Sequence, residues 1–100
     1  MKIRILSSAF RNLADGREFY ERQGDGLGGY FLNSVFSDIN SLALYAGIYR
    51  KVSGFQRLLS KRFPYAIYYQ LETGDVVVVY RVLDCRQNPR KTSAALKSAG

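Results

Sequence analysis

The feature that most constrains this chain is a pair of β-rich runs, residues 62–71 and 76–83, separated by a short polar insert. The insert contains Gly74, and glycine suits a tight turn that needs a positive φ. Two such runs joined this way predict a β-hairpin. The second run is apolar at nearly every position, as in a strand that is covered on both faces.

The position of the turn decides which side chains share a face of the hairpin. A two-residue turn at Thr73-Gly74 or at Gly74-Asp75 places odd positions of the first strand opposite even positions of the second. We therefore expect a core face made of Tyr65, Ile67, Tyr69, Leu71, Val76, Val78, Tyr80 and Val82. The other face should be a mixed surface made of Ala66, Tyr68, Gln70, Val77, Val79, Arg81, Leu83 and Cys85.

The first half of the chain predicts a strand followed by two helices. Residues 2–6 alternate polar and apolar side chains before a large apolar one, which predicts a short strand. Residues 7–23 follow a helical period, and either of two serines offers an N-cap oxygen at the start. Residues 27–45 carry an apolar stripe at helical spacing and predict the second helix. The glycine-rich segment 24–29 matches G-x-G-x-x-G, but it follows a helix, so we interpret it as a turn.

These elements predict an α+β fold. A strand centred near Arg57 precedes the hairpin, so the second half should form a three-stranded antiparallel meander. We expect this meander and the N-terminal strand to form one mostly antiparallel sheet that packs on the helical hairpin. The chain has 100 residues, enough for one core. We therefore predict a single domain at residues 1–92 and a short C-terminal tail at residues 93–100.

The net charge of +7 lies in the second half of the chain. Acidic and basic residues cancel within residues 1–49, so residues 50–100 carry the whole excess. Such asymmetry indicates an anionic partner, either nucleic acid or an acidic protein segment. A generally basic, well-solvated surface is the alternative explanation.

The composition excludes several kinds of site. The chain has no histidine and one cysteine, Cys85, so the usual zinc ligand set and an internal disulfide are both missing. The usual general base near neutral pH is missing for the same reason. We expect no metal and no cofactor. No segment has the length or apolarity of a signal peptide or a membrane span, which predicts a cytoplasmic protein without membrane association.

Basic side chains of the second half are the best site candidates, because arginines on adjacent strands can grip phosphates with two hydrogen bonds. The predicted target-binding set is Arg57, Lys61, Arg62, Tyr68, Arg81, Arg86, Arg90 and Lys91. The tyrosine in this set is included because its ring could stack on a nucleic-acid base. If the chain is an enzyme, Arg57, Arg86 and Arg90 are the catalytic candidates, stabilising a phosphorane without a metal. Asp84 is interpreted as an ion-pair partner.

Two segments carry a resemblance to a known family. These are R-F-P-Y-x-I-x-Y at residues 62–69 and V-x-x-x-R-x-x-P at residues 82–89. Together with the order of elements, they resemble the RelE/ParE family of bacterial toxins over about residues 1–92. The resemblance implies a compact α+β fold and a type II toxin–antitoxin pair, as used in plasmid stabilisation. It also implies a cognate antitoxin that neutralises the toxin, and we expect the toxin-binding segment of that antitoxin to be acidic.

The family divides by mechanism. Its RelE-like members cut mRNA in the ribosome, whereas its ParE-like members poison DNA gyrase. Arg86 matches an arginine of the RelE branch, but only Arg57 falls near the lysines of that branch, and Asp84-Cys85 stands where many relatives have histidine. These differences favour a toxin that binds a target such as DNA gyrase. Two alternatives stay open, a ribosome-dependent, metal-free mRNA endoribonuclease and a degenerate binding module without toxicity.

Overall fold

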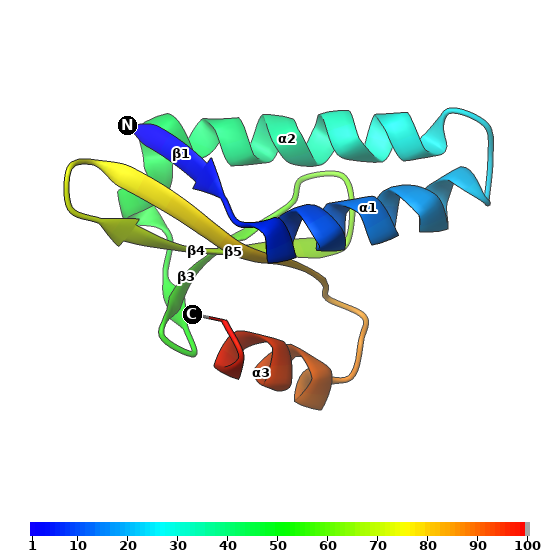
Figure 1. Cartoon of the computed structure of the whole chain (residues 1–100). Coiled ribbons are helices and arrows are strands. Elements are labelled where there is room, and N and C mark those ends of the chain that lie inside the picture. Colours follow the sequence, from blue (N-terminus) through cyan, green and yellow to red (C-terminus); the bar gives the residue numbers. More distant parts are fainter. Residues whose placement is uncertain (100) are drawn as a thin grey trace.

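The computed structural model describes residues 1–99 and contains a five-stranded sheet, a helical hairpin and a separate C-terminal helix (Figure 1). The elements, in chain order, are β1 (Lys2–Ile5), α1 (Ser7–Glu21), α2 (Leu27–Tyr45), the 3-10 turn η1 (Ala46–Ile48), β2 (Lys51–Val52), β3 (Phe55–Leu59), β4 (Tyr65–Glu72), β5 (Val76–Asp84) and α3 (Pro89–Lys97). Gly100, the last residue of the predicted tail, lies outside the described residues. None of the described helices is both long and apolar enough to cross a membrane.

The sheet has the strand order β1-β5-β4-β3-β2. Strands β2 to β5 pair antiparallel with their neighbours in the chain, whereas β1 lies parallel to β5, from Lys2 beside Val76 to Ile5 beside Val79. The predicted α+β class, N-terminal strand and antiparallel meander are thereby confirmed. The sequence did not reveal β2, a strand of two residues that pairs with the start of β3.

The helical hairpin covers one face of the sheet. Both predicted helices are confirmed, and α2 has the bounds expected from its apolar stripe. The stripe of α2 is buried in the main core, with Phe31, Val35, Ile39 and Leu42 at most 1% exposed. The predicted serine cap of α1 is wrong, because the N-cap position is Leu6 and makes no side-chain bond.

The two helices approach closely at two glycines. A Cβ atom on Gly16 would lie 2.6 Å from the Cζ atom of Phe31, a core ring. A Cβ atom on Gly28 would lie 2.7 Å from the backbone oxygen of Arg17 on the other helix. Contacts this short do not occur for real side chains, so both positions require glycine for the helices to pack.

The glycine-rich loop between the helices is a turn, as the sequence predicted. Gly26 has a φ of 85° and ends the loop in the left-handed region that suits glycine. The Glu21 carboxylate accepts the backbone N–H of Gly26 at 3.1 Å and that of Gly28 at 2.9 Å. These two hydrogen bonds lower the pKa of Glu21 and satisfy free donors at the start of α2.

The register of the β4–β5 hairpin departs from the prediction. Tyr68 lies opposite Arg81, but Tyr69 lies opposite Val79, so Tyr80 is the extra residue of a β-bulge. The connection also differs, because Glu72 pairs with Val76 and residues 73–75 form the turn. Positive φ angles at Gly74 and Asp75 fit this three-residue connection.

The bulge exchanges the faces of β5 in the half nearer the turn. The predicted core positions Val76 and Tyr80 are wrong, because both side chains are only half-buried. Val78 is fully buried, as predicted, but Val77 and Val79 occupy the main core cluster in its place. Beyond the bulge the prediction holds, with Tyr65, Ile67 and Val82 in the core. Tyr69 also lies there, fully buried, whereas Leu71 is 41% exposed.

The second face of the sheet is covered by α3, which the sequence did not predict. The cluster under this helix consists of Phe55, Ala66, Tyr68, Leu83 and Leu96. Ala66, Tyr68 and Leu83 of the predicted mixed surface therefore belong to a second small core. The helix starts at Pro89, where Asn88 Oδ1 accepts the Arg90 N–H at 2.8 Å. It runs across residue 92, and the division into residues 1–92 and 93–100 stays a prediction.

Candidate functional site

Strand β4 begins and β5 ends at one end of the sheet (Figure 1). Several of the predicted basic residues belong to the segments that adjoin this end. The backbone N–H of Cys85 donates to the Pro64 carbonyl at 2.7 Å, which holds the β3–β4 loop against the end of β5. Lys61 and Arg62 belong to this loop and are exposed. The loop thus brings them to the end of the sheet from which Arg86 extends.

A buried carboxylate fixes this loop to α2. Asp38 is 6% exposed, and its Oδ2 atom accepts the Ser60 hydroxyl at 2.7 Å and the Lys61 N–H at 3.3 Å. A buried carboxylate needs such donors to offset its lost hydration. Asp38 therefore positions the basic loop and is not free to react.

Arg86 is held in place by Asp84. Its Nε atom donates to Oδ1 at 3.0 Å and its Nη2 atom to Oδ2 at 2.8 Å, a two-point ion pair. Nη2 also lies 3.4 Å from the Tyr20 hydroxyl, and the guanidinium lies 5.7 Å from the centre of the Phe19 ring. The ion pair lowers the pKa of Asp84 and raises that of Arg86. Arg86 is therefore a fixed positive charge that faces α1, with its side chain 52% exposed.

Three predicted residues form a row across the sheet on its α3 side. Arg57 on β3 pairs with Tyr68 on β4, which pairs with Arg81 on β5. The Tyr68 ring is 4% exposed and packs in the cluster under α3. It presents no open face on which a base could stack in this arrangement.

The Arg81 side chain makes hydrogen bonds that connect three elements of the fold. Its Nη1 atom donates to the Ser8 hydroxyl and, at 2.8 Å, to the Tyr80 carbonyl. Its Nη2 atom lies 3.4 Å from the Ser98 hydroxyl. The side chain therefore links the start of α1, β5 and the end of α3, and these contacts use most of its donors.

Arg57 borders a cavity of about 250 Å³ between the sheet and the start of α3. The lining includes Tyr68, Asp84 and Cys85. Burial raises the pKa of the Cys85 thiol, although Arg57 partly opposes this effect. The thiol is thus protonated near neutral pH and is a poor nucleophile.

Arg90 and Lys91 lie in the first turn of α3, and both are exposed. Cations at a helix N-terminus meet the positive end of the helix dipole, and this turn has no acidic residue to balance them. The two side chains therefore contribute a positive surface that does not stabilise the helix.

The predicted basic residues at this end of the sheet lie on both of its sides. Arg86 faces α1 on one side of the sheet, whereas Arg57 borders the cavity on the α3 side. Asp84 separates them and lines a cavity on each side. Contact of these residues with a target, and catalysis by Arg57, Arg86 and Arg90, stay predictions.

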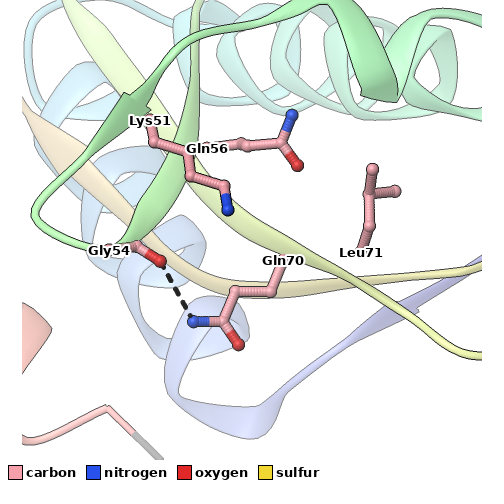
Figure 2. A pocket seen from close by; sticks show the side chains of 5 residues that line it. All are labelled: Lys51, Gly54, Gln56, Gln70 and Leu71. Atoms are coloured by element: carbon pink, nitrogen blue, oxygen red, sulfur yellow. Dashed lines mark hydrogen bonds between the residues drawn. The ribbon is translucent and has the colours of Figure 1, made fainter.

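Another cavity, of about 500 Å³, lies at the other end of β4 (Figure 2). The described residues that line it are Lys51, Gly54, Gln56, Gln70 and Leu71, and among these only the lysine is charged. The Gln70 amide donates to the Gly54 carbonyl at 3.3 Å across it (Figure 2). The Gln56 amide instead donates to two backbone carbonyls. These lining groups offer no acid–base pair.

Comparison with known proteins identifies the fold. No protein-family model matches the sequence, and no curated protein matches it. Among solved structures, a chain of the "Chromosomal ParDE TA system from P. aeruginosa" matches with a TM-score of 0.72 and 16% sequence identity. The match covers 82% of this chain and 92% of that chain. The fold is RelE/ParE-like. The resemblance found in residues 62–69 and 82–89 is thus confirmed at the level of the fold.

On this RelE/ParE-like fold, Arg86 lies beside the exposed ring of Phe19, which sequence reasoning missed, as it missed the exposed ring of Tyr30. Phe19 is 45% exposed and Tyr30 is 48% exposed, and the ring centres of Tyr30 and Phe63 lie 5.5 Å apart. We call Phe19, Tyr30, Arg62, Phe63 and Arg86 the hairpin-tip surface, after the tip of the helical hairpin α1–α2, near which Phe19 and Tyr30 lie. The sequence signal was the placement of Phe19 at a solvent-facing position of α1, where a polar residue is expected.

Proposed function

We propose that this chain is the toxin of a bacterial type II toxin–antitoxin pair and acts in the cytoplasm by binding a cellular target. The observation that carries the proposal is the RelE/ParE-like fold, which matches nearly the whole of a chain from a ParDE system. DNA gyrase is the leading candidate target, as the ParE-like resemblance implies.

The arrangement of the arginines supports target binding over RNA cleavage. An endoribonuclease that uses Arg57, Arg86 and Arg90 must place them around one phosphate. Here Asp84 holds Arg86 on the α1 side, and Arg57 lies on the α3 side. The chain also has no histidine to move a proton near neutral pH.

The hairpin-tip surface suits contact with a protein. Exposed aromatic rings and arginine are enriched at the centres of protein interfaces. Arg86 is already oriented by Asp84, so it loses little side-chain freedom when it binds. We therefore assign target binding to this surface, with Lys61 at its margin.

Induction of the chain in a bacterial host from a tightly repressed promoter tests this proposal. Growth should stop, cleaved DNA–gyrase complexes should accumulate, and mRNA should stay intact. Cuts in mRNA on ribosomes would instead support the endoribonuclease. Normal growth with abundant folded protein would contradict the toxin proposal. The remaining alternative would then be a degenerate binding module without toxicity.

An alanine substitution at Arg86 tests the surface itself. Arg86→Ala removes the charge from the hairpin tip and should relieve growth arrest. Arg11→Ala is the matched control, since Arg11 is an exposed arginine elsewhere on α1. Circular dichroism should show that both variants fold. Full toxicity of folded Arg86→Ala would remove this residue from the site.

A further inference from the structure

A cavity of about 210 Å³ lies between α1 and the end of β5, on the side of the sheet that the helical hairpin covers. We call it the α1 cavity. The cavities at Arg57 and at Lys51 each contain a basic side chain. The described residues that line the α1 cavity include two acidic side chains, Asp15 and Asp84, and no basic one. Its charge is thus opposite in sign to the net charge of +7 on the whole chain.

Tyr65 presents a hydroxyl group to the α1 cavity. The residue lines the cavity and is only 7% exposed, and a Cβ atom on Gly16, which also lines it, would lie 3.3 Å from the hydroxyl oxygen. Within residues 1–99 this hydroxyl makes no hydrogen bond, although every fully buried polar side-chain atom there has a partner. The Tyr65 hydroxyl is therefore open to the cavity, where a ligand can supply the partner that a buried polar group needs.

Both carboxylates of the cavity lie close to this hydroxyl. Burial raises the pKa of Tyr65 to about 12, and the negative charges of Asp84 and Asp15 act in the same direction. Asp84 is already paired with Arg86 through both of its oxygens. Asp15 makes no ion pair within residues 1–99, so its charge is left unbalanced. Asp15 is thus the carboxylate that can receive a positively charged ligand.

The remaining polar groups of the cavity are mainly acceptors. The Gln87 amide nitrogen donates to a threonine hydroxyl at 3.2 Å, which leaves the amide oxygen available to a ligand. Asn12 uses its amide oxygen to accept a backbone N–H of β5 at 3.0 Å and keeps an amide nitrogen as a donor. Together with the Asp15 carboxylate and the Tyr65 hydroxyl oxygen, acceptors outnumber donors. This excess suits a ligand that is rich in N–H groups.

We infer that the α1 cavity binds a guanidinium or ammonium group on an alkyl chain. The Asp15 carboxylate would be the counter-ion, and the Tyr65 hydroxyl and the Gln87 amide oxygen would accept further N–H donors. The ring of Phe19 also lines the cavity and would pack against the alkyl chain.

Such a cation has two possible sources, a lysine or arginine side chain of the target protein and a free small cation. Phe19 belongs to both the α1 cavity and the hairpin-tip surface, so a side chain of a protein bound at that surface would be close to the cavity. Only this first source rests on the proposed function.

Titration of the folded full chain with methylguanidinium, followed by two-dimensional NMR of the backbone amides, tests the site. The amide signals of Asp15, Gly16 and Gln87 should shift and saturate, with a Kd of about 1–10 mM for so small a ligand. Methylurea is the matched neutral ligand and should bind at least about fivefold more weakly. Equal binding of the two ligands would overturn the inference.

Two substitutions test the predicted contacts. Asp15→Asn removes only the charge and should weaken methylguanidinium by about fivefold, whereas Tyr65→Phe removes only the hydroxyl and should weaken it by about threefold. The matched controls are Asp25→Asn and Tyr45→Phe, at exposed positions away from the cavity, and they should change affinity by less than about 1.5-fold. Neither test substitution removes a hydrogen bond within residues 1–99, so both variants should fold. Unchanged affinity in Asp15→Asn, or shifts that never saturate and spread over other exposed carboxylates, would overturn the site.

The growth assay separates the two sources and the two proposals. If a side chain of the target enters the cavity, Asp15→Asn should relieve growth arrest and Asp25→Asn should not. If the ligand is a free cation, Asp15→Asn should lose methylguanidinium binding and keep full toxicity. Growth arrest by a chain that does not bind methylguanidinium would mean that only the cavity is wrong. Saturable binding with normal growth would mean that only the toxin proposal is wrong.

Discussion

Asp84 and Arg86 show how two neighbouring residues prepare a charged surface at the end of β5. The guanidinium makes two hydrogen bonds to the carboxylate, and these bonds are the main reason why the pKa of Asp84 is lowered. The arginine is thereby oriented before any partner arrives. Sequence reasoning predicted Asp84 as an ion-pair partner, because it lies two residues from an arginine at a strand end.

Removal of Arg86 should make Asp84 titrate more like an ordinary aspartate. In Arg86→Ala, the pKa of Asp84 should rise toward the usual aspartate value, because the hydrogen bonds to the charged form are lost. In the unmodified chain, the lowered pKa stabilises the fold at pH values above about 4, and this contribution is lost as the pH falls further. Carboxyl NMR titration of both proteins measures the shift. An unchanged Asp84 titration would show that the ion pair does not form in solution.

Buried tyrosines should make the fold sensitive to high pH. Burial raises the pKa of Tyr65 and of Tyr69 to about 12. Both groups titrate near pH 10 when unfolded, so their contribution to stability is complete below about pH 10. It should be lost as the pH rises toward about 12. Tyrosinate absorbance measures the titration of the two tyrosines, and the urea midpoint at each pH measures the stability of the fold. Tyr69→Phe should reduce the loss of stability at high pH.

At the scale of elements, the α1–α2 contact depends on two glycines, Gly16 and Gly28, where any side chain would be too large. Gly28→Ala should destabilise the fold by about 1–3 kcal/mol, because the added methyl group meets the rigid backbone of Arg17. Gly29→Ala is the matched control, since a Cβ atom there meets nothing within 4 Å. It should leave stability unchanged or raise it by up to about 1 kcal/mol. Urea unfolding compares the two, and equal effects would contradict the close approach.

The elements that sequence predicted are those with a regular period. The apolar stripe of α2 allowed this helix to be predicted, because its buried side chains recur every three or four residues. The bulge at Tyr80 could not be predicted, because a run of valines looks the same on both faces. The bulge decides which valines reach the main core, and only the three-dimensional pairing with Tyr68 and Tyr69 reveals it.

Helix α3 was missed for a related reason. Its apolar side chains are few, and the cluster that receives Leu96 combines side chains of three strands, β3, β4 and β5, which share a face only once the sheet has formed. The site was only partly predictable as well. The basic residues were identified by their charge, but the side of the sheet each one faces depends on the fold, as Arg57 and Arg86 show.

At the scale of the whole molecule, α3 should stabilise the second face of the sheet. Leu96 is 4% exposed, so Leu96→Ala should cost about 2–4 kcal/mol of unfolding free energy. Leu44→Ala is the matched control, since Leu44 is 80% exposed and should change stability by less than about 0.5 kcal/mol. Thermal unfolding compares the two variants. A negligible effect of Leu96→Ala would mean that α3 is not docked in solution.

The parallel pairing of β1 with β5 joins residues 2–5 to residues 76–79. A ribosome makes β1 first, but its partner strand emerges only after the helical hairpin and three further strands. The nascent protein therefore cannot complete its sheet until most of the chain has been synthesised. Any activity that needs the complete sheet therefore begins only after residues 76–79 have left the ribosome.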